Sequence, residues 1–335
     1  MIMMKMKRFL MTAMSVFLMA TLACSEDGIP GTPDEGNWVE KSDFEGAIRS
    51  GAVGFAINGI GYVGTGYDGD NRLSDFWQYD PDRDAWRRLA DFPGVARSAA
   101  MAFTVNGKGY IGAGYDGTNE LSDFWEYDPA LDSWRQVADL AGPARHSGIA
   151  FGLGDKGYIG TGFDGSNDLK DFWEYNPSTD AWTQRTSVGG SKRIGAFTFT
   201  INGVPYVGGG SHNDILEEDL WKYDPVEDLW TELNDLDDDL SGGDDIARAS
   251  AVAFVVNGKA YLSTGTGDGI LADTWAYYPD EDEWQELTGF EGRARTAAVA
   301  FAINDVGYVV TGRNGNSRYD DIWLFNPLEA YEEND

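Results

Sequence analysis

Six arginines recur along the 335-residue chain at nearly constant spacing, each just before a short apolar stretch. Successive members are separated by 48, 48, 48, 55 and 47 residues in the series Arg49, Arg97, Arg145, Arg193, Arg248 and Arg295. A guanidinium group makes charge-assisted hydrogen bonds to a carboxylate, which can belong to a ligand or to the protein itself. The sequence leaves both roles open: ligand binding at one end of each repeat, or pairing with a repeated aspartate between repeats.

The residue eighteen places after each arginine changes in type between the two halves of the chain. It is aromatic in the first three copies and not in the last three, in the series Tyr67, Tyr115, Phe163, Ser211, Thr266 and Arg313. Of the two histidines, His146 directly follows Arg145 and His212 directly follows Ser211. Aromatic faces and fixed polar groups in a concave mouth commonly hold small molecules and peptide loops. We therefore predict one ligand-binding face that combines the six arginines, the three aromatic residues, both histidines and Arg313.

The chemistry of that predicted face favours an anionic ligand. Inward-pointing arginines would make charge-assisted hydrogen bonds to a carboxylated sugar or to an acidic peptide loop. The aromatic rings would add stacking on one side, while Arg313, Ser211 and His212 would make the other side polar.

Other kinds of chemistry find little support in the sequence. Residues 64–69, GTGYDG, have the spelling of a dinucleotide-binding loop, but a strand follows where that loop needs a helix N-terminus. Asp68 and Asp70 lack the spacing and the closing glutamate of an EF-hand, although loosely bound calcium in these loops stays open. The chain contains no Gly-x-Ser-x-Gly motif. We expect neither a cofactor nor a metal site.

Each arginine opens one copy of a repeat. In the first copy Phe55, Tyr62 and Trp77 follow Arg49 by 6, 13 and 28 residues, and the other five copies keep this order. An aspartate precedes the tryptophan strand in every copy: Asp75, Asp123, Asp171, Asp219, Asp273 and Asp321. Alternating small and large apolar residues, Asn-Gly turns and Asp-Pro turns divide each copy into four short strands with no room for a helix.

Repeats of four short strands build a β-propeller, with one blade per copy. The spacing resembles the kelch repeat, in which an arginine precedes the first strand, a tyrosine leads into a glycine pair, and a tryptophan follows. The resemblance covers residues 37–327 and departs from the kelch pattern at the glycine pair, where Gly-Thr-Gly stands at 64–66. It implies an all-β, six-bladed kelch-type propeller.

The two ends of the repeat region predict how the ring closes. Trp38 precedes Arg49 by eleven residues, which is the spacing between the last-strand tryptophan of one copy and the arginine of the next. The sixth copy has no such tryptophan of its own after Asn326-Pro327. We therefore predict that the N-terminal segment around Trp38 supplies the outer strand of the last blade.

The first 24 residues differ in composition from the repeats. Lys5, Lys7 and Arg8 precede an apolar run at 9–22 that is too short for a comfortable membrane span, and Cys24 follows as the one cysteine of the chain. This segment resembles a bacterial lipoprotein signal, which implies lipidation of Cys24 and attachment to the outer membrane, exposed at the cell surface. An ordinary secretory signal with an incidental cysteine is the alternative.

We therefore expect four regions: a signal peptide at 1–23, a flexible acidic tether at 24–36, the propeller at 37–327 and an acidic tail at 328–335. With no second cysteine there are no internal disulfides. The net charge of −31 argues against nucleic acid as a partner. We expect a monomer that contacts the membrane only through lipid on Cys24.

The resemblance also bounds the function. Galactose oxidase activity is not expected, because its copper site needs a tyrosine crosslinked to a cysteine and the chain has no cysteine beyond Cys24. We expect a binding module for a glycan or protein partner, without a catalytic site that the sequence identifies. The alternative is a sugar-processing enzyme, such as a mutarotase or epimerase of the kelch propeller type, which needs only a general base in the mouth.

Overall fold

The computed structural model describes residues 35–236 and 246–332, and every regular element within these ranges is a β-strand. The predicted signal peptide, the tether before residue 35 and Cys24 lie outside the described residues. So do the last three residues of the predicted acidic tail. Within the described ranges no helix is long and apolar enough to cross a membrane.

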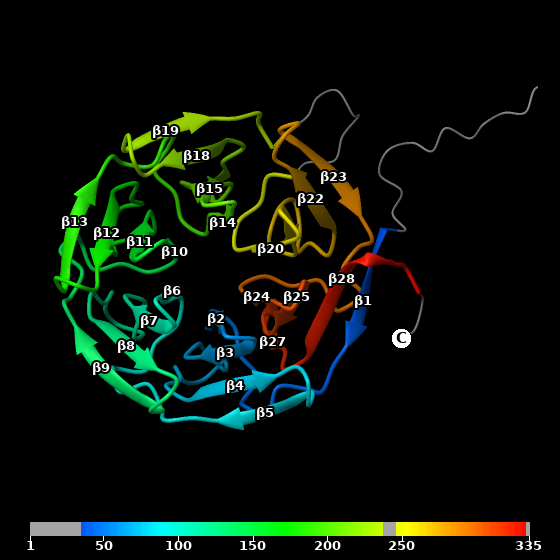
Figure 1. The fold of residues 1–335 in the computed structure, drawn as a ribbon, viewed down its shortest axis with the longest axis horizontal. Coiled ribbons are helices and arrows are strands. Elements are labelled where there is room, and N and C mark those ends of the chain that lie inside the picture. The colour runs from blue at the N-terminus through cyan, green and yellow to red at the C-terminus, as the bar shows by residue number, and fades with distance from the viewer. Residues whose placement is uncertain (1–34, 237–245, 333–335) are drawn as a thin grey trace, which may run out of the picture. The chain divides into compact units, whose positions relative to one another are not determined.

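The described residues form six four-stranded antiparallel sheets arranged as blades around one axis (Figure 1). Blade one contains β2 (Val53–Ile57), β3 (Ile60–Gly64), β4 (Phe76–Asp80) and β5 (Ala85–Arg88). Blade two contains β6 (Met101–Val105), β7 (Lys108–Gly112), β8 (Phe124–Asp128) and β9 (Ser133–Val137). Blade three contains β10 (Ile149–Leu153), β11 (Lys156–Gly160), β12 (Phe172–Asn176) and β13 (Ala181–Arg185). The first strand of each blade is innermost and the fourth is outermost.

Blades four to six follow the same order. Blade four contains β14 (Phe197–Ile201), β15 (Val204–Gly208), β18 (Leu220–Asp224) and β19 (Leu229–Glu232). Blade five contains β20 (Val252–Val256), β21 (Lys259–Ser263), β22 (Thr274–Tyr278) and β23 (Glu283–Leu287). Blade six contains β24 (Val299–Ile303), β25 (Val306–Val310), β28 (Ile322–Ala330) and β1 (Glu35–Glu40). Two small hairpins lie in the loops of blades four and six, namely β16 (Ser211–His212) with β17 (Ile215–Leu216) and β26 (Arg313–Asn314) with β27 (Ser317–Arg318).

The alternation of the first strands explains the core. In β6, Met101, Phe103 and Val105 are almost fully buried in the core between the second and third blades, while the smaller Ala102 packs against the core between the first and second blades. The strand then turns back at Asn106-Gly107, and both residues have positive φ angles (52° and 71°), as a two-residue hairpin requires. The predicted all-β, six-bladed fold is confirmed.

The N-terminal strand closes the ring. Strand β1 pairs antiparallel with β28, so the last blade takes three strands from the C-terminal end of the chain and one from the N-terminal end. Trp38 lies opposite Phe325 in this pairing and is fully buried. Closure by the segment around Trp38 is therefore confirmed, and the pairing of Glu35 with Ala330 carries the blade slightly beyond the predicted 37–327 limits.

A closed circle of backbone hydrogen bonds joins the blades near the start of the first strands. The N–H of one residue per blade donates to the carbonyl oxygen of its counterpart in the preceding blade, at 2.7 to 3.0 Å, around the series Gly51, Ala99, Ser147, Gly195, Ser250 and Ala297. We call these six residues the backbone belt. All six have positive φ angles, between 50° and 63°, so the chain bends sharply at each of them.

Candidate functional site

The six repeated arginines are fully buried and point into their own blades. Arg97 shows the arrangement: its guanidinium donates to both carboxylate oxygens of Asp123, at 2.8 and 2.7 Å, and to the carbonyl oxygens of Val95 and Ala113. The same bidentate pair occurs in every blade, as Arg49–Asp75, Arg97–Asp123, Arg145–Asp171, Arg193–Asp219, Arg248–Asp273 and Arg295–Asp321.

This geometry corrects the prediction that Arg49, Arg97, Arg145, Arg193, Arg248 and Arg295 line a binding mouth. A fully buried arginine that is paired with a carboxylate and with carbonyl oxygens of its own blade is not accessible to a ligand. The alternative of structural pairing is the one observed, with one change, because each pair lies within a blade instead of between blades. Neighbouring blades are joined by other aspartates. Asp132, for example, accepts from the backbone N–H of Ala90 at 3.0 Å and from the hydroxyl of Tyr127.

The arginine also explains the departure from the kelch glycine pair. Thr65 adopts a left-handed conformation, with φ of 59°, and its carbonyl oxygen accepts a 2.9 Å hydrogen bond from Arg49. The next residue, Gly66, has φ of 104° and its missing side chain makes room for Ala52. Position 65, the first of the pair, therefore needs a positive φ, which threonine adopts at an energetic cost. Position 66, the second, needs glycine.

Three aspartates of these pairs make folding sensitive to acid. Burial alone would raise the pKa of Asp123, but the hydrogen bonds and charge of Arg97 outweigh it and hold that pKa below its usual value of 3.8. The pKa values of Asp75 and Asp171 are lowered in the same way, by Arg49 and Arg145.

We therefore expect the thermal unfolding midpoint to change little between about pH 7 and 5 and to fall progressively below about pH 4. Because the folded-state pKa is depressed, the stabilisation is complete above the unfolded-state pKa and is lost as the pH falls through the folded-state value. Calorimetric melts across this range measure it. A midpoint that stays level down to about pH 2 would contradict the role assigned to the carboxylates.

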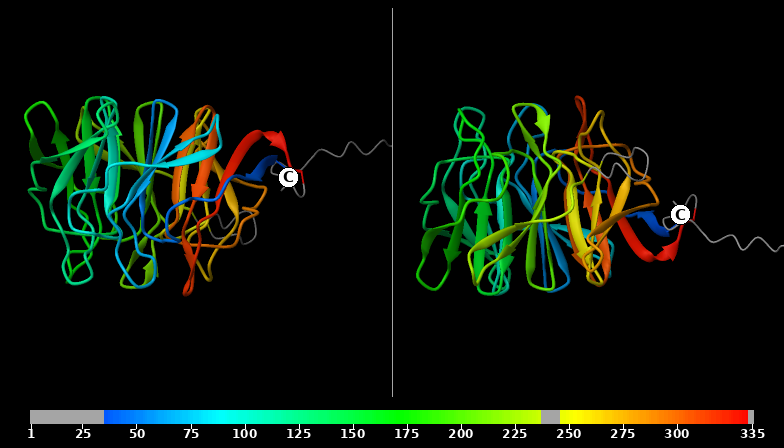
Figure 2. Two further views of the ribbon diagram at one scale, coloured as in Figure 1. Left: turned by 90° about the horizontal axis from the view of Figure 1, so that it is seen from below. Right: turned by 90° about the horizontal axis from the view of Figure 1, so that it is seen from above.

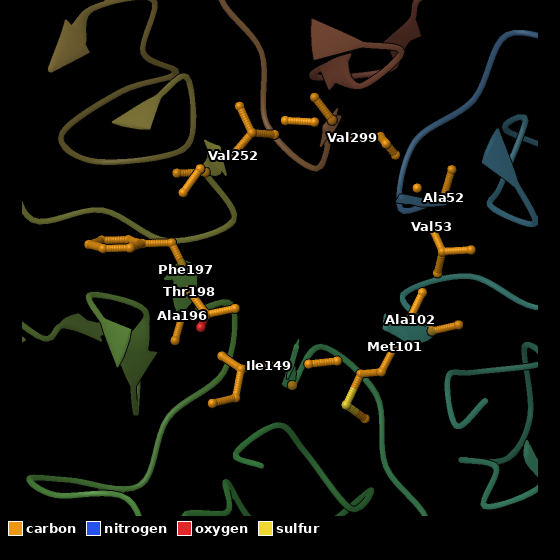
Figure 3. Close-up of a pocket in the computed structure, with 18 residues that line it drawn as sticks. Ala52, Val53, Met101, Ala102, Ile149, Ala196, Phe197, Thr198, Val252 and Val299 are labelled. Atoms are coloured by element: carbon orange, nitrogen blue, oxygen red, sulfur yellow. The ribbon is translucent and has the colours of Figure 1, made fainter. Parts of the chain in front are cut away.

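The central channel offers little chemistry. A cavity of about 200 Å³ runs between the first strands and is lined by alanine, glycine and larger apolar residues (Figure 3). The polar side chain among them is Thr198, and its hydroxyl donates to the carbonyl oxygen of Tyr206 at 2.8 Å. Reactive or charged groups that could meet a ligand must be sought at the mouth.

Seen from the side, the connections between strands lie at the two faces of the ring (Figure 2). The loops between second and third strands meet the segments before the first strands through isolated backbone bridges. Backbone bridges fix this contact in every blade with the aromatic series: Ser50 pairs with Tyr67, Ser98 with Tyr115 and His146 with Phe163. The prediction that both kinds of segment share a face is therefore confirmed.

Three aromatic residues and three basic residues at this face form a continuous series of contacts across blades six, one, two and three. The guanidinium carbon of Arg318 lies 4.7 Å from the ring centroid of Tyr67, and that of Arg72 lies 5.1 Å from Tyr67 and 4.7 Å from Tyr115. His146 then lies 5.6 Å from both Tyr115 and Phe163, centroid to centroid. We call this series the arginine–aromatic stack: Arg318, Tyr67, Arg72, Tyr115, His146 and Phe163.

His146 has a protonation state that suits proton transfer. Burial lowers its pKa below the usual value of 6.5, against the opposing effect of Glu120, so the imidazole is neutral at pH 7. Its Nδ1 lies 2.9 Å from the hydroxyl of Ser147, and its Nε2 lies 3.9 Å from a carboxylate oxygen of Glu120.

The second histidine lies one blade further on. Nδ1 of His212 lies 2.7 Å from Asp168 of the preceding blade, and its Nε2 lies 3.0 Å from the amide nitrogen of Asn213. Arg313 begins the hairpin β26–β27 and is exposed, and its guanidinium reaches the carbonyl oxygen of Gly315 at 3.4 Å. Nowhere in the described ranges do three side chains of the metal-binding types gather around one point.

Sequence reasoning missed Arg72, Arg318, Glu120 and Asp168. All four stand twenty-three places after their repeat arginine, and the equivalent residue of the fourth blade is Leu216. The available signal was the same one that identified the aromatic series, namely a position that changes in type from copy to copy.

The kelch motif matches residues 49–93 and 96–141, which contain the first two blades. A solved structure, titled as the structure of YjhT, is similar over 84% of this chain and 95% of its own, with a TM-score of 0.72 and 16% sequence identity. The comparison with curated proteins gave no match. At this identity the likeness establishes a common fold and nothing about ligands. The chain is a six-bladed β-propeller that carries kelch motifs.

Proposed function

We propose that this protein is a binding module that recognises a glycan or protein ligand through the arginine–aromatic stack. The observation that carries the proposal is the contrast between framework and stack. The arginine–aspartate pairs and the backbone belt are present in all six blades, whereas the stack is confined to four of them. The residues of the stack differ from blade to blade, lie on one face and contact one another. The other blades fold without such a series of contacts, so folding alone does not account for it.

The residues of the stack also suit recognition. Tyrosine and arginine dominate the binding energy of many interfaces, because they offer large rigid surfaces and several hydrogen bonds. Here all six side chains are partly exposed, and mutual stacking holds them in fixed positions, which reduces the entropy lost on binding. Surface display through a lipid on Cys24 is part of the proposal and rests on the sequence alone.

Tyr115→Ala is expected to weaken binding at least about tenfold, because it removes the ring between Arg72 and His146. The matched control is Thr266→Ala, which changes the equivalent position of the fifth blade, outside the stack. A glycan array and a pull-down with candidate surface proteins would identify the ligand, and titration of both variants would follow. Equal losses in the two variants, or none in Tyr115→Ala, would contradict the proposal.

An enzyme is the second candidate, and His146 is the observation that favours it. A neutral imidazole with a carboxylate nearby can accept and return a proton, as a sugar mutarotase requires. Proton NMR of a freshly dissolved sugar anomer would separate the two candidates. Faster anomer exchange with the protein, abolished by His146→Ala, would establish the enzyme.

A further inference from the structure

We infer that the arginine–aromatic stack is a carboxylate-binding element, and that its ligand carries one carboxylate group beside hydroxyl groups, as in a sugar acid. The inference rests on the proposed function and specifies the ligand of the same site. It depends on three features of the stack: what already contacts its rings, which donors remain free, and which charges surround it.

The tyrosine rings are not free to stack on a sugar. The ring of Tyr67 has the guanidinium groups of Arg72 and Arg318 within about 5 Å of its centroid. The ring of Tyr115 contacts both Arg72 and His146. The sequence predicted open aromatic faces, and the structure fills them with residues of the protein itself. Recognition therefore depends on the edges of the stacked groups, which carry hydrogen-bond donors.

The donors of the two arginines are held in place without being used up. Nε of Arg72 and Nε of Arg318 are buried without an acceptor among the described residues, so only the terminal nitrogens can meet a ligand. Those of Arg72 make no hydrogen bond within the described residues, and of those of Arg318 only Nη1 does, donating to the carbonyl oxygen of Asn316. Neither arginine has a carboxylate partner like those of the buried framework pairs. A planar guanidinium that stacks on an aromatic ring keeps its in-plane N–H groups available, and their fork matches a carboxylate.

Glycines seat these guanidinium groups. A Cβ atom at Gly117 would lie 2.5 Å from the terminal nitrogen of Arg72, and one at Gly69 would lie 3.0 Å from that of Arg318. Each glycine belongs to the blade that follows its arginine. The loop of one blade therefore fixes the cation of the blade before it, so that the donors are positioned before any ligand arrives.

The surrounding charges favour a single carboxylate over a polyacidic ligand. Asp68 and Asp116 lie within electrostatic reach of Arg318 and Arg72, respectively, and Glu120 lies beside His146. These carboxylates repel a run of acidic residues but accept hydrogen bonds from hydroxyl groups. A small ligand with one carboxylate and several hydroxyls satisfies both parts of the site, whereas an acidic peptide satisfies one.

The test uses glucuronate and glucose as probes, because they differ at one carboxylate. Isothermal titration of the protein is expected to give at least about tenfold tighter binding of glucuronate, and addition of salt is expected to weaken it. Arg72→Gln with Arg318→Gln should remove this preference. Arg83→Gln is the matched control, since Arg83 is 81% exposed in the turn between β4 and β5.

Equal affinity for the two sugars, absence of glucuronate binding at millimolar concentration, or a preference for a hexaglutamate peptide would overturn the inference. The proposed function has a separate outcome. If a glycan or protein binds and loses affinity in Tyr115→Ala but not in the double arginine variant, the binding face stands and carboxylate recognition falls.

Discussion

Replacing Arg145 by alanine is expected to lower the free energy of unfolding by about 3–5 kcal/mol, because it leaves a carboxylate unpaired inside the blade. Arg145 is fully buried and binds both oxygens of Asp171 at 2.6 Å, and it also donates to the carbonyl oxygens of Pro143 and Thr161. After the substitution Asp171 keeps the hydrogen bond from Trp173 at 2.6 Å and loses its countercharge.

Denaturant titration of the unmodified protein and of four variants measures this effect. Arg145→Ala is compared with Asp171→Ala, with the double variant and with Arg83→Ala at an exposed position. The double variant should be less destabilised than the two single variants added together, because removing both partners leaves no unpaired charge. Arg83→Ala should change the unfolding free energy by less than about 0.5 kcal/mol. Additive losses in the double variant would show that the two residues stabilise the blade independently.

Trp38→Ala is expected to lower the free energy of unfolding by a similar amount, about 3–5 kcal/mol, because it leaves a cavity in the core where β1 closes the ring. Trp38 is fully buried, and its ring lies 4.8 Å from Phe290 of the fifth blade and 4.7 Å from Phe325 of β28, centroid to centroid. The substitution thus weakens both the strand pairing and the contact between the last two blades.

The matched control for Trp38→Ala is Val226→Ala, since Val226 is 86% exposed and should tolerate truncation. Thermal melts followed by tryptophan fluorescence give the comparison. A single cooperative transition at a lower temperature is expected, because the blades share one closed ring. An unchanged midpoint for Trp38→Ala would mean that β1 contributes little to closure.

The repeat period made the fold predictable from the sequence. Six copies of the same spacing fixed the number of blades, and the lone Trp38 before the first copy fixed the closure. Such inferences depend on local strand patterns and on chain connectivity, which each copy repeats and so confirms.

The orientation of the repeated arginines was less accessible. Arg97 precedes its strand by several residues, and the positive φ of Ala99 breaks the regular alternation between them. The constant interval to Asp123 was a usable signal, but it did not tell a pair within a blade from one between blades. The stack was harder still, because the contact of Arg72 with Tyr115 depends on how a loop of one blade lies over the next.

The backbone belt contains no side-chain atoms in its six hydrogen bonds. Its geometry is therefore indifferent to the identity of the residues directly before it, which are Ser50, Ser98, His146, Ile194, Ala249 and Thr296. One of these is the histidine of the stack and the others are small, aliphatic or hydroxylated, yet the six-membered circle of hydrogen bonds is the same at each. The hydrogen bonds of the belt and the side chains of the stack therefore use separate atoms, so the side chain before each belt residue can change in type without altering the ring of backbone hydrogen bonds.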